Sequence, residues 1–324
     1  MLISAVATLT VAVTIVSLWA VWSYRGPGPR ATQGEITNVM LRRGSGLNEI
    51  ATSLERSGAV RSATLFIAAA QVTGAARELK AGEYEFPSRA PMARVLDDIR
   101  AGRIVRRQIT IPEGMTSEMV IDALNREESL TGVAPTPPEG AILPETYDFE
   151  RGEDRAAVLQ RMMDARDTLL ATLWAQRKAN LPVTTPEEAV ILASIVEKET
   201  GIASERPRVA SIFVNRLRKG MRLESDPTII YGISKGRPLG RGIRKSELIN
   251  PANRYNTYLI DGLPPTAIAN PGRAALAAVL DPPETDDLFF VADGTGGHDF
   301  SPTYEEHARK VERLRAIERG QAGK

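Results

Sequence analysis

Residues 185–201 read TPEEAVILASIVEKETG and carry start and stop signals for one short helix. Thr185 and Glu188 have the spacing of a capping box, and Pro186 stands at the first helical position, where no N–H is needed. Gly201 is expected to end the helix in the left-handed backbone conformation that glycine adopts easily. The sequence therefore predicts a helix with two defined ends.

Glu199 is the candidate catalytic residue of this helix. It follows Leu192, Ile195 and Val196 at helical spacing, so it completes the bulkiest apolar face. It also lies in the last turn, where the helix dipole disfavours negative charge. Burial and the dipole both favour the protonated carboxyl, the form that a general acid needs near pH 7. The alternative is that residues 197–199 form a plain, solvated helix end.

The composition limits the classes of function. The 324 residues are enough for about two domains and additional segments. With 41 basic and 40 acidic residues the net charge is +1, so no nucleic-acid partner is predicted. The absence of cysteine excludes disulfides and cysteine nucleophiles, and two histidines, His298 and His307, argue against a histidine-rich metal site. We therefore expect no metal and no other cofactor.

An uncharged apolar segment occupies residues 2–22. It is long enough to span a bilayer core of roughly 30 Å, and Trp19 and Trp22 lie at its end, as interfacial aromatics do. A cleaved signal peptide is the alternative, but the run is long and no small-residue cleavage site follows cleanly. We predict a retained anchor. Arg25 and Arg30 follow the segment, which weakly favours a cytoplasmic body by the positive-inside rule.

The predicted fold class is α+β, with an N-terminal transmembrane helix, a small α+β module and a mixed α+β C-terminal domain. We expect an anchor, a linker rich in Gly and Pro, the module, a connecting segment and the C-terminal domain, at residues 1–24, 25–34, 35–108, 109–153 and 154–324. The module is expected to contain a strand, two helices and a return strand in this order, at residues 36–41, 47–58, 62–74 and 80–86, followed by a helix at 92–101 and a strand at 105–111.

The C-terminal domain is predicted to be helical before an irregular region. Hydrophobic stripes indicate a long helix over residues 154–180 and another that Ser204 caps and Gly220 ends. From there to Gly272 the chain lacks regular periodicity, and an irregular region of this length is usually functional. Two strands with a Gly-rich turn are predicted within residues 288–300, followed by a final helix.

Three clusters in the irregular region combine hydroxyls, amides and aromatic rings on a backbone stiffened by proline. They are LESDPTIIYG at 223–232, YNTYLIDGLPP at 255–265 and IANPG at 268–272. Such groups suit a carbohydrate, which needs directional polar contacts and a few stacking faces. Each cluster alone is also ordinary turn chemistry, but three close together favour a cleft.

Together these stretches resemble the endolytic murein transglycosylase family (MltG/YceG-like). The resemblance rests on ASIVEKET at 193–200, ASER at 203–206, VNRL at 214–217, DPT at 226–228, YNTY at 255–258, GLPP at 262–265, NPG at 270–272 and GHDF at 297–300. It covers nearly the whole chain and is weaker in the first hundred residues. Two positions depart from the family pattern: Glu145, where Asp is usual, and Glu224, where Gln is typical.

The resemblance implies a single-pass inner-membrane protein with its body in the periplasm, against the weak charge signal. It implies internal cleavage of peptidoglycan glycan strands, with Glu199 as the catalytic residue and Glu197 as the fallback. Protonated Glu199 would donate to the oxygen between N-acetylmuramic acid and N-acetylglucosamine. It would then take the proton of the muramic C6 hydroxyl, which closes onto C1 and leaves a 1,6-anhydro end.

Several further expectations accompany this resemblance. The candidates for holding the sugars are Asp226, Thr228, Tyr231, Tyr255, Asn256 and Tyr258. The module resembles the LysM peptidoglycan-binding fold in its strand, its turn and helix at residues 44–51 and its return strand near Tyr84; the alternative is a packing module that binds nothing. Peptidoglycan synthases (penicillin-binding proteins) are implied partners. The alternative functions are a muramidase, in which water attacks, and a non-enzymatic glycan-binding scaffold of the envelope.

Overall fold

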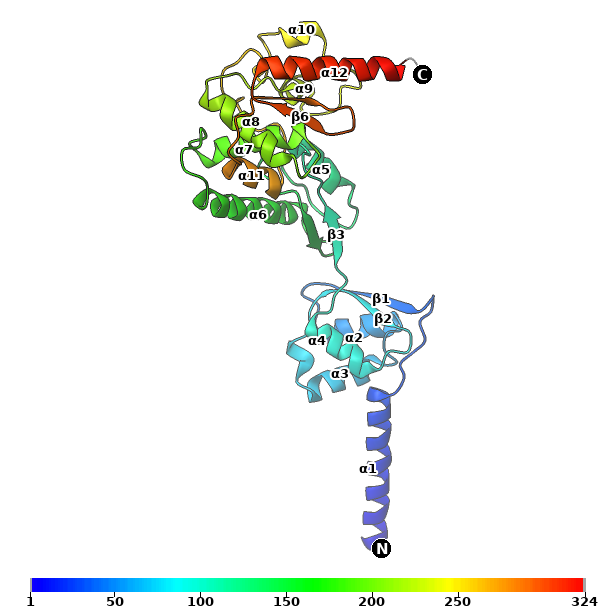
Figure 1. Ribbon diagram of the computed structural model, residues 1–324. Coiled ribbons are helices and arrows are strands. Elements are labelled where there is room, and N and C mark those ends of the chain that lie inside the picture. The colour runs from blue at the N-terminus through cyan, green and yellow to red at the C-terminus, as the bar shows by residue number, and fades with distance from the viewer. Residues whose placement is uncertain (1, 323–324) are drawn as a thin grey trace. The chain divides into compact units, whose positions relative to one another are not determined.

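The structure, a computed structural model, describes residues 2–322 and divides them into two compact units (Figure 1). Unit 1 comprises the chain up to Arg107 together with residues 148–152, and unit 2 comprises residues 108–147 and the chain from Glu153 onward. The six strands of the described residues form three two-stranded sheets among many helices. The fold is therefore mixed α+β, as predicted.

Unit 1 begins with a long apolar helix. Helix α1 runs from Leu2 to Arg25, and its part Ala7–Arg25 is long and apolar enough to cross a membrane. None of that part is buried inside the protein. A helix of this kind near the N-terminus is compatible with a membrane anchor or a signal sequence.

The rest of unit 1 has the predicted order of elements. They are β1 (Ile36–Leu41), α2 (Leu47–Arg56), α3 (Ala63–Val72), the 3-10 turn η1 (Ala75–Arg77), β2 (Gly82–Pro87) and α4 (Met92–Ala101). β1 pairs with β2 antiparallel, with Val39 opposite Tyr84. Alternation along β1 buries Val39 but leaves Ile36 49% exposed, although both are apolar.

Unit 2 is built mainly from helices. Its elements are α5 (Ser117–Arg126), α6 (Arg155–Ala175), α7 (Pro186–Glu199), α8 (Arg206–Arg218), α9 (Asp226–Ser234), α10 (Lys245–Leu248), α11 (Arg273–Leu280), β5 (Phe289–Ala292), β6 (His298–Ser301) and α12 (Tyr304–Ala322). Strands β3 (Arg107–Thr110) and β4 (Thr146–Phe149) form a further two-stranded sheet. β5 and β6 pair antiparallel, which confirms the predicted hairpin.

Helix α7 is the centre of unit 2 and packs against α6, α8, α9 and α11 (Figure 1). It is therefore buried on nearly all sides rather than along one face. The predicted capping box is present: the Glu188 N–H donates to Thr185 Oγ1 at 3.1 Å, and the Glu188 carboxylate accepts the Thr185 N–H at 3.3 Å. The helix ends within one residue of the predicted end, but the predicted stop was wrong, because Thr200 in an extended conformation (φ −141°) follows the helix, not a left-handed Gly201.

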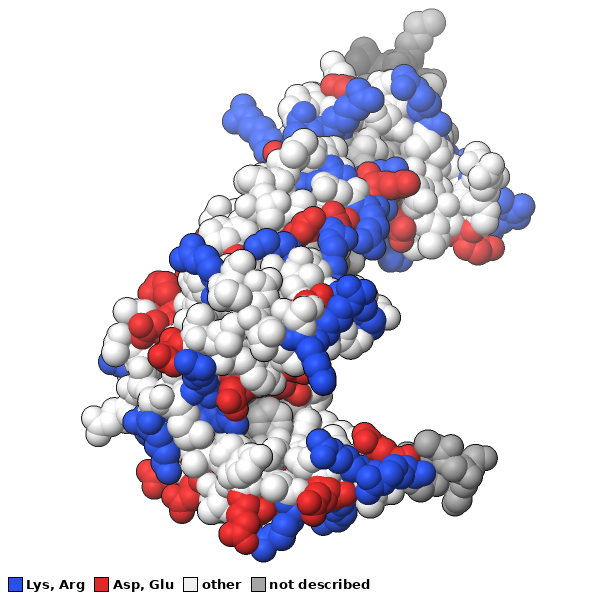
Figure 2. Space-filling view, turned by 90° about the horizontal axis from the view of Figure 1, so that it is seen from above, with Lys and Arg blue, Asp and Glu red and all other residues white. Residues whose placement is uncertain are grey.

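Other boundaries also differ from the prediction. Helix α8 has Glu205 rather than Ser204 at its N-cap, and no side chain caps it. Helix α9 lies in the stretch that lacked periodicity, since it is only 9 residues long. Helix α11 was not predicted, although it packs against both α7 and α8. On the face shown in Figure 2, basic and acidic side chains are interspersed, in keeping with the net charge of +1.

Candidate active site

Glu199 is the last residue of α7 and is partly buried. The pKa of its carboxyl is raised from 4.5 to about 7, chiefly by burial and also by the nearby negative charge of Asp226. A hydrogen bond from Ser225 and the positive charges of His298 and Arg216 oppose this rise. The carboxyl therefore titrates near neutral pH, where it can both donate and accept a proton.

Ser225 contacts the Glu199 carboxyl directly. Its Oγ donates to Glu199 Oε1 at 2.5 Å. The serine is held in place by two buried threonines, since its N–H donates to Thr257 Oγ1 at 2.9 Å and its carbonyl accepts from Thr228 Oγ1 at 2.6 Å. Thr228 and Thr257 have no exposed surface. These hydroxyls therefore fix the loop that carries the hydrogen-bond donor to Glu199.

Asp226 and Tyr258 form a second contact near Glu199. Asp226 is exposed at the first position of α9, and the Tyr258 hydroxyl donates to its Oδ1 at 2.8 Å. Burial and the charges of Asp226 and Glu199 raise the pKa of Tyr258, so its hydroxyl stays protonated. Two of the six predicted sugar contacts therefore lie beside Glu199.

Glu197 has a different environment from Glu199, although both lie in the last turn of α7. Its side chain is 4% exposed, accepts the Gly272 N–H at 2.9 Å and pairs with Arg206 at 3.2 Å. Arg206 also reaches Glu113 at 3.5 Å. Burial raises the pKa of Glu197 above its usual value, and the Gly272 N–H and the Arg206 charge oppose only part of this rise. The structure thus gives Glu197 an ion pair, a backbone donor and little exposed surface.

Of the other four predicted sugar contacts, Thr228, Tyr231 and Asn256 are buried in unit 2 and Tyr255 is partly exposed. Tyr231 and Tyr255 contact each other edge to face, with ring centroids 4.9 Å apart, and Lys235 Nζ lies 5.3 and 5.4 Å from the two ring centres. Asn256 is fully buried, and its amide donates to the Leu248 carbonyl at 2.8 Å. Tyr231 is buried too, and Thr228 belongs to the hydroxyl cluster under Ser225.

Four residues of this surrounding were not predicted: Ser225, Arg216, His298 and the Glu224 side chain that pairs with Arg216 at 3.1 Å. His298 Nδ1 lies 2.7 Å from Glu205 Oε2. Glu224 has a left-handed backbone (φ 51°), which is unusual for a residue with a side chain. All four lie in the sequence clusters or motifs named above, but no local sequence pattern predicts that they lie near Glu199.

Comparison with known proteins adds a family to this geometry. Residues 39–313 match the YceG-like family. Endolytic murein transglycosylases of Streptococcus pneumoniae (strain D39) and Bacillus subtilis (strain 168) are 28% and 27% identical over 87% and 85% of this chain. The matched region spans 59% of the S. pneumoniae protein and 84% of the B. subtilis protein.

A solved structure also matches most of the chain. It is the 2.6 Å crystal structure of a yceG-like protein from Listeria monocytogenes. The two share 26% sequence identity and a TM-score of 0.53, and the match covers 85% of this chain and 98% of the other. Sequence and fold thus point to the same group of proteins.

Proposed function

Because the chain belongs to the YceG-like family, we propose that it is an endolytic murein transglycosylase that cleaves peptidoglycan glycan strands internally. The observation that carries the proposal is the Glu199 carboxyl, which is partly buried, accessible and raised in pKa to about 7. Such a group is half protonated near neutral pH, which suits a single residue that acts first as acid and then as base.

The reaction follows from this one carboxyl. Protonated Glu199 donates to the oxygen between N-acetylmuramic acid and N-acetylglucosamine, and the bond to muramic C1 breaks through an oxocarbenium-like state. The resulting carboxylate takes the C6 hydroxyl proton while O6 bonds to C1, so a 1,6-anhydro end forms and no water is consumed. Ser225 stabilises the carboxylate in this second step, because its Oγ donates to Glu199 at 2.5 Å.

The six candidate sugar residues take different proposed roles. Asp226 and Tyr258 are exposed or partly exposed beside Glu199, so we assign them to direct sugar contacts. The partly exposed ring of Tyr255, which leans on Tyr231, offers a stacking face. Thr228 and Asn256 are buried and act through the loops that they hold. Each role predicts a different loss: affinity for exposed residues, and stability for the buried ones.

The chemistry is tested by the fate of solvent oxygen. The full chain is incubated with purified glycan strands in ¹⁸O-water, and mass spectrometry reads the new ends, with Glu199→Gln alongside. Anhydro ends without ¹⁸O that vanish in the variant are the expected result. Reducing ends that carry ¹⁸O would identify a muramidase. Unchanged binding of glycan without cleavage by either protein would favour a scaffold.

The membrane arrangement is part of the same proposal. We assign α1 as a retained single-pass anchor of the inner membrane, with residues 35–108 as a LysM-like glycan-binding module and 154–324 as the catalytic domain in the periplasm. Support comes from the apolar Ala7–Arg25 span and the strand–helix–helix–strand order of the module. Peptidoglycan synthases are the proposed partners. A C-terminal reporter that is active only outside the cytoplasm tests the orientation.

A further inference from the structure

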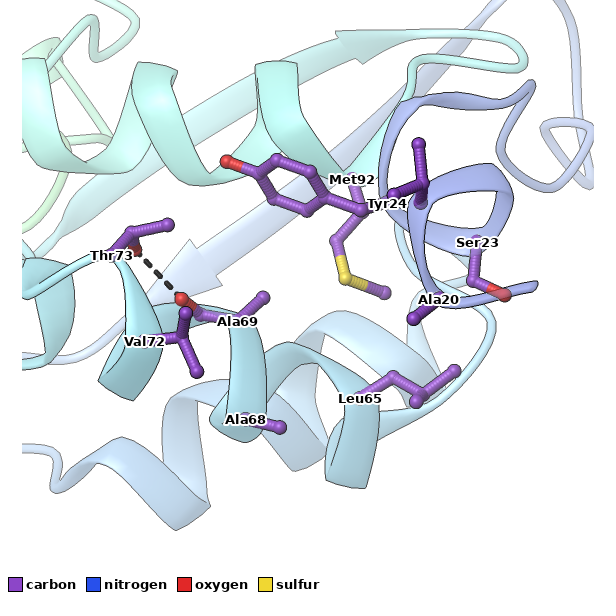
Figure 3. Close-up of a pocket in the computed structure, with 10 residues that line it drawn as sticks. Ala20, Ser23, Tyr24, Leu65, Ala68, Ala69, Val72, Thr73 and Met92 are labelled. Carbon is purple, nitrogen blue, oxygen red and sulfur yellow. Dashed lines mark hydrogen bonds between the residues drawn. The ribbon is translucent and has the colours of Figure 1, made fainter. Parts of the chain in front are cut away.

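An apolar pocket lies between the end of α1 and the module of unit 1 (Figure 3). Its volume is about 300 Å³, and α1 contributes Ala20 and Tyr24 to its wall. Leu65 and Val72 of α3 and Met92 at the start of α4 also line it. The Thr73 hydroxyl at its edge already donates to the Ala69 carbonyl at 2.7 Å, so it needs no water there.

Helix α3 has an unusual surface for a water-exposed helix. None of its ten residues is charged. Phe66 and Ala70 face the core of the module, while Leu65, Ala68 and Val72 line the pocket on another face. Val72 is 89% exposed. A helix that is apolar on its outer face as well as its inner face normally has a second apolar environment.

The end of α1 is held against the module, because the segment that follows α1 is hydrogen-bonded to the module. The Gly28 N–H donates to the Arg89 carbonyl at 3.0 Å, and the Arg89 N–H donates to the Pro29 carbonyl at 2.8 Å. A Cβ at Gly28 would lie 2.1 Å from the Ala90 carbonyl oxygen, so the backbones touch here. Arg61 donates to the Pro27 carbonyl at 3.1 Å. Helix α3 therefore keeps its place beside the last turns of α1.

The position of the pocket along α1 indicates what fills it. Its α1 residues lie between Ala20 and Tyr24, in the last turns of the span Ala7–Arg25. At 1.5 Å per residue these residues lie within about 8 Å of the end of the span, which is the depth reached by interfacial helices. The Arg61 guanidinium lies 5.7 Å from the centre of the Trp22 ring, a cation and an aromatic typical of the headgroup level.

From this geometry we propose that the outer face of α3 rests in the interface of the bilayer that α1 spans, with a phospholipid acyl chain in the pocket. The proposal rests on α1 being a retained anchor, as assigned above. Arg25 and Arg61 are exposed at the same level and suit lipid phosphates. Unit 1 is then a membrane-bound body and not a domain suspended above the bilayer.

The test uses the absence of cysteine from the chain, because one introduced cysteine takes one label. Val72→Cys in the full chain is labelled with an environment-sensitive fluorophore and placed in nanodiscs of phosphatidylcholine and phosphatidylglycerol. The matched control is Glu85→Cys, which is exposed on β2 between buried Tyr84 and Phe86 and so points away from the core. We expect spin-labelled acyl chains to quench the Val72 label, and iodide to quench it several-fold less than the control.

Two results would overturn the proposal, and they differ in meaning. Equal quenching of both labels by iodide, with the chain retained in the discs, would show that α3 faces water and that only the docking is wrong. A chain that does not stay with the discs would refute the anchor and the docking together. Glycan cleavage by the same labelled chain reports the proposed enzymatic function separately.

Discussion

Glu199→Gln is expected to abolish glycan cleavage and at the same time to stabilise unit 2 at neutral and alkaline pH. Glutamine keeps the shape of the side chain and can still accept the Ser225 hydroxyl, which donates to Glu199 at 2.5 Å. It has no proton to transfer, and general acid–base catalysis contributes about 10²–10⁴-fold to a rate. The loss of cleavage should be at least this large.

The gain in stability follows from the raised pKa. Burial moves the pKa of Glu199 from 4.5 to about 7. Between these values the folded protein holds a proton that the unfolded chain has lost, so the free energy of unfolding falls as pH rises, by about 1.4 kcal/mol per pH unit. The full loss is roughly 3 kcal/mol above pH 7. The variant escapes it, so it should match the parent near pH 4.5 and exceed it by up to roughly 3 kcal/mol at pH 8.

The assay pairs urea denaturation at several pH values with glycan cleavage, and Trp174 serves as the fluorescent probe of unit 2. Glu197→Gln is the matched control two residues away. It removes the nearer of the two acidic partners of Arg206, whose side chain is 9% exposed, and should cost about 2–3 kcal/mol while the folded fraction keeps its activity. Opposite signs of the two stability changes are the expected result.

The reasoning would be refuted by either of two outcomes. If Glu199→Gln changed stability by the same amount at pH 5 and pH 8, the raised pKa could not be the cause. If Glu197→Gln abolished cleavage in fully folded protein while Glu199→Gln did not, the two glutamates would have the reverse roles. A loss of secondary structure, read by circular dichroism, separates misfolding from both outcomes.

Three further substitutions test the surroundings of Glu199. Ser225→Ala removes a hydrogen-bond donor that lowers the pKa of Glu199. The alkaline limb of the pH profile of kcat/KM should therefore move to higher pH. Asp226→Asn removes a negative charge that raises the pKa of Glu199, so the same limb should move to lower pH. Shifts in the same direction for both variants would contradict the proposed electrostatics. Gly272→Ala places a Cβ 1.8 Å from Glu113 Oε1 and should lower Tm by about 2–4 °C without moving the limb, as thermal unfolding and pH profiles would show.

Helix α7 could be predicted because its signals are local. Thr185 and Glu188 make the capping box within four residues, and the apolar run between them and Glu199 needs a helix to bury it. The end of the helix could not be predicted in the same way. Thr200 is buried in an extended conformation and accepts the Ile202 N–H at 3.0 Å, so a side-chain hydrogen bond replaces the expected glycine turn.

The surroundings of Glu199 could not be predicted because they come from distant parts of the chain. Ser225 lies 26 residues after Glu199 and reaches it through a loop that two buried threonines hold. The sequence alone does not distinguish a hydroxyl or amide that faces a cleft from one that faces the core. For this reason Thr228 and Asn256 looked like sugar contacts, whereas the structure uses both inside the protein.

The difference between the two glutamates of α7 also explains why the active carboxyl stands at a helix end. Glu197, one half-turn earlier, lies at the level where Arg206 and the backbone of Gly272 contact the helix, so its charge is partly compensated, although burial still raises its pKa. Glu199 lies beyond this level, beside the Ser225 hydroxyl and the negative charge of Asp226, and the positive charges of His298 and Arg216 oppose only part of the rise in its pKa. A group that must donate a proton and then regain one needs a pKa near the working pH, and full compensation would hold it as a permanent anion. The raised pKa of Glu199 is therefore the property that the rest of the site has to preserve. The opposite pH shifts expected for Ser225→Ala and Asp226→Asn measure the interaction that lowers this pKa and the one that raises it.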